Sequence, residues 1–154
     1  MIKSIKHTAI AVLLLPLLFM GCDDLFDKGD VEKSYDGPDV VAFADLQSTV
    51  NEGSSLTVEI QFISSQGLAN SDVNISISAE GVTDDPATPN TYSLSTNSVT
   101  ISSGTATAEM TVDFPTNGDI GSGDEVVLSL TLTSSDAAPS EELDTKTIFI
   151  RGVD

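Results

Sequence analysis

The chain has 154 residues, with 24 Asp and Glu against only six Lys and Arg, which gives a formal net charge of −18 at pH 7. Binding to a phosphate backbone requires clustered basic residues, so this composition excludes nucleic acid as a partner. The length fits one domain, and a single cysteine, Cys22, allows no disulfide within the chain.

Residues 1–21 have the layout of an export signal. Lys3 and Lys6 precede the run Ile10–Met20, which carries no charge, and Gly21 follows. This run is far shorter than the roughly 20 residues that a membrane-spanning helix needs. We therefore predict that the segment is a signal peptide that is removed.

The end of this segment, Leu18–Cys22, resembles a bacterial lipobox, which implies cleavage before Cys22 and lipidation of that cysteine. Asp23 and Asp24 follow directly and resemble the signals that send lipoproteins of the Bacteroidota to the outer face of their outer membrane. The resemblance implies a lipid-anchored protein of the outer membrane, at the cell surface. The alternative is an ordinary secretory signal cleaved nearby, which would leave one unpaired thiol.

Removal of residues 1–21 also removes the only histidine, His7, and leaves 24 acidic against four basic residues, a formal charge of −20. Once Cys22 is acylated, no imidazole or thiol remains for nucleophilic catalysis. The same loss disfavours zinc and leaves oxygen ligands, which suit calcium or magnesium. We predict no enzyme. A glycosidase-like carboxylate pair is disfavoured because the domain has no evident cleft-forming insertion.

Residues 22–39, the lipidated cysteine and an acidic linker, contain few apolar residues and are predicted to be a disordered tether. From Val40 to Asp154 apolar and polar residues alternate in short runs separated by Gly, Asn, Asp, Ser and Pro, which predicts half-buried strands. The predicted strands are 40–50 with a break near 45–47, 56–63, 73–79, 98–101, 105–114, 125–133 and 145–151.

Strands of this kind bury their apolar faces by stacking two sheets. We predict an all-β fold, an immunoglobulin-like antiparallel β-sandwich of about seven strands. In the last strand the alternation places Ile148 and Ile150 inside, with Lys146 on the same face at the rim.

Successive strands alternate in direction, so several acidic loops should meet at one pole of the sandwich. Carboxylates that converge from different loops can supply the six to eight oxygens that calcium takes. For each residue alone, a solvated turn is the simpler interpretation, because Asp and Asn favour turns. The candidate calcium ligands are Glu52, Asp84, Asp85, Asn90, Asp113, Asp119, Asp124 and Asp154.

Four segments resemble the Calx-beta domain: 50–53 with 56–60, 90–94, 99–104 and 123–130. The resemblance spans about Val40 to Asp154 and implies a calcium-binding sandwich that acts as a binding or adhesion module. It matches Glu52 and Asp154 to acidic positions of the family. The family carries more aspartates at the positions of Asn90-Thr91-Tyr92 and Asp113-Phe114. Two interpretations of the calcium site therefore stay open, a working site and a degenerate one.

The leading hypothesis is a cell-surface lipoprotein whose sandwich is a non-catalytic binding, adhesion or structural module, with calcium as a possible cofactor. Its partners would be the membrane, through the lipid anchor, and a protein or glycan ligand. The alternative is an accessory glycan-binding lipoprotein of a polysaccharide-uptake system. Sugar sites favour aromatic platforms, and in the domain we identify only Tyr92 for that role.

Overall fold

The computed structural model describes residues 35–82 and 84–153, which form ten strands and no helix. The predicted signal peptide, Cys22 and most of the acidic linker lie outside the described residues, as does Asp154. No described helix is available that could cross a membrane. The all-β prediction is confirmed for the part of the chain that the structure describes.

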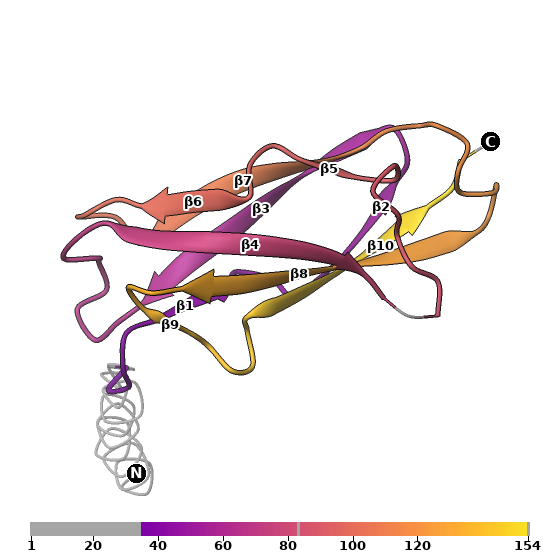
Figure 1. Cartoon of the computed structure of the whole chain (residues 1–154). Coiled ribbons are helices and arrows are strands. Elements are labelled where there is room, and N and C mark those ends of the chain that lie inside the picture. The colour runs from indigo at the N-terminus through magenta and orange to yellow at the C-terminus, as the bar shows by residue number, and fades with distance from the viewer. Residues whose placement is uncertain (1–34, 83, 154) are drawn as a thin grey trace, which may run out of the picture. The chain divides into compact units, whose positions relative to one another are not determined.

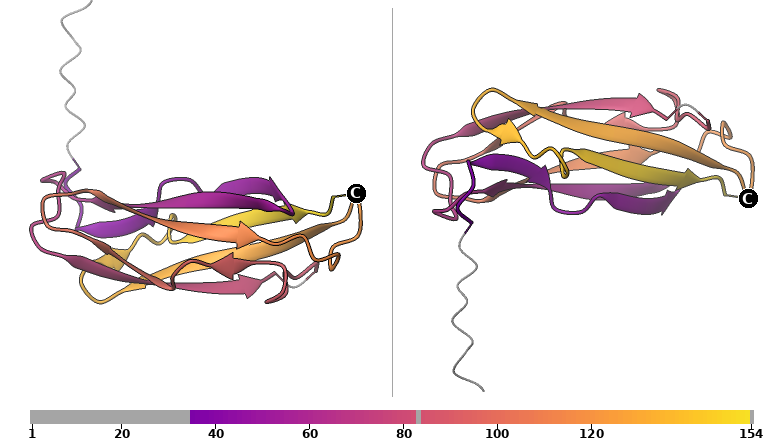
Figure 2. Two further views of the ribbon diagram at one scale, coloured as in Figure 1. Left: turned by 90° about the horizontal axis from the view of Figure 1, so that it is seen from above. Right: turned by 90° about the horizontal axis from the view of Figure 1, so that it is seen from below.

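The strands form two five-stranded sheets that pack face to face (Figures 1 and 2). The first sheet has the order β5 (Ser93–Leu94), β7 (Thr107–Phe114), β3 (Ser54–Ile63), β1 (Val40–Phe43) and β9 (Ala138–Pro139). The second has the order β2 (Gln47–Asn51), β10 (Thr145–Arg151), β8 (Glu125–Ser134), β4 (Val73–Gly81) and β6 (Ser98–Ile101).

The core lies between the sheets and is built by the alternating residues of each strand. Ile60 and Met110 come from the first sheet, and Ile75, Leu130 and Ile148 come from the second; all are buried in one cluster. Burial of each such side chain contributes roughly 1.5–3 kcal/mol. The inward positions expected from the period of two are therefore the positions that hold the sandwich together.

The first strand is divided between the two sheets, with its break where the sequence predicts it. β1 pairs antiparallel with β3, whereas β2 pairs parallel with β10. A purely antiparallel sandwich was therefore the wrong expectation at this edge, and β1 also pairs parallel with β9. The physical reason is that the chain crosses from one sheet to the other near Asp45 and then runs alongside the last strand in the same direction. β5 and β9, two residues each, were not predicted.

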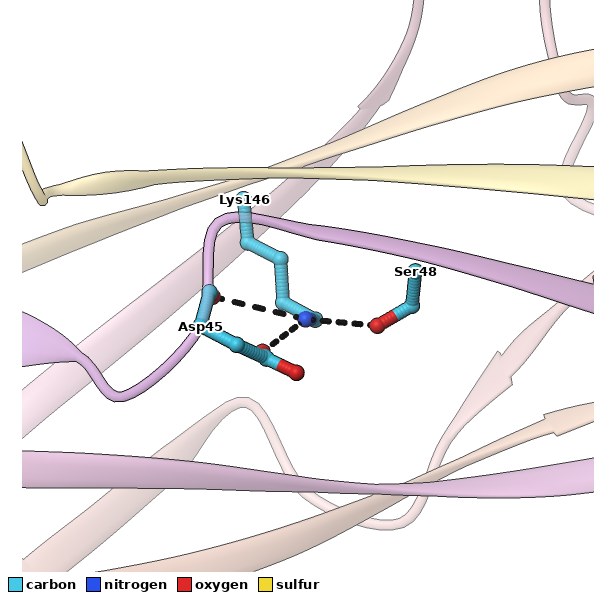
Figure 3. Close-up of polar contacts among 3 residues, drawn as sticks. All are labelled: Asp45, Ser48 and Lys146. Carbon is cyan, nitrogen blue, oxygen red and sulfur yellow. Dashed lines mark hydrogen bonds and ion pairs between the residues drawn. The ribbon is translucent and has the colours of Figure 1, made fainter.

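Lys146 is completely buried, which corrects its expected place at the rim. Its Nζ donates to Ser48 Oγ at 2.8 Å and to the Asp45 carbonyl oxygen at 3.4 Å, and it forms an ion pair with Asp45 Oδ1 (Figure 3). The alternation along β10 puts this side chain on the core face, and the break in the first strand supplies its acceptors. Lys146 thus fastens the crossing between β1 and β2 to the last strand.

Candidate functional site

One end of the sandwich, here called the C-terminal pole, gathers the β2–β3 turn, residues 84–92, the loop 115–124 and residues 152–153. Backbone hydrogen bonds join them: Glu52 N donates to Arg151 O at 3.0 Å, and Gly152 N donates to Asp124 O at 3.0 Å. Figure 1 shows these loops around the C-terminal end of β10. Loops distant in sequence are thus held together by main-chain contacts.

An open hollow of about 470 Å³ lies at this pole. Its lining includes four carboxylate residues, Asp85, Asp119, Asp124 and Glu125. The loop that carries Asp85 is held in place because Val127 N donates to Asp85 O at 2.8 Å. Three of the predicted calcium ligands therefore border one hollow, and Glu125 was not among the predicted ligands.

Glu52 occupies the tight turn between β2 and β3. Gly53 follows with a φ of 79°, a left-handed conformation that glycine adopts without steric cost. The Glu52 residue is only 6% exposed, and its Oε1 is buried with no hydrogen-bond partner among the described residues. A buried oxygen without a partner costs about 1–3 kcal/mol of stability. The Glu52 carboxylate therefore lacks the cation or hydrogen-bond donor that would compensate for its burial.

The remaining predicted ligands are placed differently. Asp113 Oδ1 accepts a hydrogen bond from Ser55 Oγ at 2.5 Å, and both residues line a second hollow of about 240 Å³. The carbonyl oxygen of Asn90 accepts from Asn117 Nδ2 at 2.5 Å. Asp84 is exposed, and Asp154 lies outside the described residues. The eight predicted ligands therefore do not share one hollow.

Carboxylates border the pole without converging on a point. Among the described residues, no three Asp, Glu, Cys or His side chains form a group that could hold a metal ion. Arg151 Nε donates to Glu125 Oε2 at 3.0 Å across the β8–β10 pair. Sequence reasoning missed this ion pair, although residues of opposite charge that lie directly opposite each other on antiparallel strands commonly interact.

Comparisons with known proteins bear on the fold. No family model matches this chain, and no curated protein matches it. A solved structure from Bacteroides ovatus, titled a "putative carbohydrate binding protein", superposes with a TM-score of 0.61 at 15% identity over 75% of this chain and 37% of that one. The apo-form Calx CBD1 domain gives 0.59 at 12% identity over 77% and 100%.

The likeness is one of fold. A periplasmic chaperone, SfaE, also superposes, with a TM-score of 0.53 at 11% identity, over 73% of this chain and 57% of that one. The chain spans little more than a third of the length of the Bacteroides ovatus protein. The Calx CBD1 domain is covered over its whole length, so the shared architecture with a Calx-beta sandwich extends through the domain.

Proposed function

We propose that this protein is a lipid-anchored, non-catalytic binding module of the cell surface whose C-terminal pole is stiffened by calcium. The observation that carries the proposal is the buried, unpartnered Oε1 of Glu52 at the pole where acidic loops meet. A cation there would supply the missing partner.

The donor chemistry fits calcium, because carboxylate and carbonyl oxygens are the ligands that this ion takes. Glu52 would be its first ligand. Asp85, Asp119 and Asp124 border the hollow at the same pole without converging on Glu52 in this structure, so their loops would have to move toward the ion to complete the site. When bound, the ion would supply positive charge that offsets the repulsion among these carboxylates. The residues themselves link three loops and the end of β10, so filling the site would restrict the loops relative to one another.

Anchoring would come from Cys22, on the resemblance of Leu18–Cys22 to a lipobox, with the acidic linker as spacer. Acylation with more than one chain gives stable membrane attachment. Fractionation of cells that express the full chain tests this part: Cys22→Ser should move the protein from the membrane fraction to the soluble fraction. A variant that stays in the membrane fraction would remove the anchor from the proposal.

The calcium part is tested by melting curves in calcium and in chelator. Calcium should raise the melting temperature of the natural chain and leave that of Glu52→Gln nearly unchanged. Glu142→Gln is the matched control, because Glu142 is exposed and lies in the β9–β10 connection, away from the pole. An equal calcium shift in all three proteins would exclude Glu52 as a ligand.

A further inference from the structure

The outer face of the second sheet carries an aromatic residue in the middle of a regular array. β10 lies between β2 and β8, and the register aligns their outward residues in rows. The central row is Thr49, Phe149 and Val127. The rows on either side are Gln47, Thr147 and Ser129, and Asn51, Arg151 and Glu125. We call these nine residues the Phe149 face.

Phe149 points away from the core. Its neighbours Ile148 and Ile150 are both completely buried, and successive side chains of a strand point to opposite faces of the sheet. Phe149 itself is half-buried, as are Val127 and Thr147 on the same face. The ring therefore lies on the solvent side of the sheet, with part of its surface accessible and the rest covered.

The polar groups around the ring are free to bind a ligand. Within residues 35–82 and 84–153, the side chains of Gln47, Thr49, Asn51, Ser129 and Thr147 make no hydrogen bond to another residue. The far end of the same sheet differs, because there Asn74 accepts from Thr100 Oγ1 at 3.0 Å and donates to Asp136 at 3.1 Å. The side chain of Asn74 therefore bonds to other residues of the protein, whereas the polar side chains around Phe149 keep donors and acceptors that a ligand could use.

The Phe149 face is also neutral on a strongly acidic protein. Arg151 and Glu125 are its only charged residues, and they pair with each other; the nearest further charge on the sheet is Glu80 of β4, which lies beside Ser129 at the border of the face. Across three strands it measures roughly 10 Å, and from the first row to the third roughly 13 Å. A neutral, flat area of this size with an aromatic centre and a polar border does not complement a nucleic acid, a basic protein or an anionic polymer.

We propose that the Phe149 face binds a neutral oligosaccharide. One sugar ring would stack its apolar side on Phe149, because the flat faces of aromatic rings pack well against such surfaces. The hydroxyls of that sugar and its neighbours would then meet Gln47, Thr147 and Ser129 on one side and Asn51 and Arg151 on the other. This inference rests on the proposed function only in treating the domain as a binding module, and it does not involve calcium.

The test is calorimetric titration of the purified protein with neutral oligosaccharides of glucose, mannose, galactose and xylose, and with an acidic galacturonate oligosaccharide. At least one neutral sugar should bind the natural chain. Phe149→Ala should weaken that binding about tenfold or more, a loss of about 1.4 kcal/mol, and Phe149→Trp should retain it. Leu68→Ala is the matched control, because Leu68 is an exposed apolar residue, 50% exposed, in the β3–β4 loop at the opposite end.

Thr147→Val keeps the shape of the face and removes one hydroxyl, so it should weaken binding without changing the melting temperature. This variant tests the face even if Phe149→Ala melts early. Binding of no neutral sugar, binding of the acidic sugar alone, or unchanged binding by both variants would overturn the proposal. Association of the natural chain with itself through this face, detected by sedimentation and abolished by Phe149→Ala, would also overturn it. Calcium-dependent melting is measured separately, so either proposal can fail alone.

Discussion

Glu52→Gln gives the sharpest prediction, because its stabilising effect in chelator should disappear or reverse in calcium. In chelator, Glu52 Oε1 is buried without a partner, and removing the charge at nearly constant shape should stabilise the fold by about 1 kcal/mol. For a domain of this size that corresponds to a rise in melting temperature of about 3–5 °C. The variant should therefore melt above the natural chain when calcium is absent.

In calcium the order should change. If the proposed site binds calcium with a dissociation constant of about 0.1–1 mM, about 5 mM calcium would stabilise the folded state by about 1–2 kcal/mol. The natural chain gains this stabilisation and the variant does not, so the two melting temperatures should converge or cross. Differential scanning calorimetry of both proteins in both buffers checks it. A variant that melts below the natural chain in chelator would show that the Glu52 carboxylate stabilises the fold without calcium and is therefore a structural group rather than a calcium ligand.

Three further predictions concern the scaffold. Asp45→Ala should destabilise the domain by about 2–4 kcal/mol, because it leaves the buried Lys146 ammonium without its carboxylate. Lys146→Met should destabilise it less, because the Asp45 side chain is 63% exposed and can be solvated by water. Urea titration of both variants compares the two losses of stability. Glu59 and Glu109 face each other directly on β3 and β7, so Glu109→Lys should stabilise by about 0.5–1 kcal/mol in the same assay. Hydrogen bonds from the Asn74 backbone and side chain lower the pKa of Asp136. The Asp136 carboxylate therefore stabilises the fold above about pH 4, and this contribution is lost as the pH falls through the lowered pKa. Asp136→Asn should make the free energy of unfolding, measured by urea titration at several pH values, depend less on pH on the acid side.

Most of the fold could be predicted because alternation is a local signal. Leu128, Leu130 and Leu132 identify β8 and its buried face without any knowledge of its neighbours. The partners of a strand are not local, and the division of the first strand between two sheets follows from the path of the chain near Asp45. The parallel pairing of β2 with β10 could not be read from either segment alone.

The site was harder to predict for the same reason. Asn51-Glu52-Gly53 signals a turn, but the burial of Glu52 depends on the end of β10, almost 100 positions later in the sequence. The alternation that places Ile148 and Ile150 inside also places Phe149 outside, yet the significance of that ring emerges only when Thr49 and Val127 are aligned beside it. Sequence reasoning sought an aromatic platform at Tyr92, whose hydroxyl instead donates to the Ala79 carbonyl oxygen at 3.3 Å.

Calorimetric titration of the purified protein with calcium determines whether the C-terminal pole binds the ion through Glu52, as we propose. We expect saturable binding with a dissociation constant of about 0.1–1 mM, abolished in Glu52→Gln and unchanged in Glu142→Gln. Absence of binding to the natural chain at about 5 mM calcium, well above that range, or equal binding by Glu52→Gln, would rule out a calcium site at Glu52.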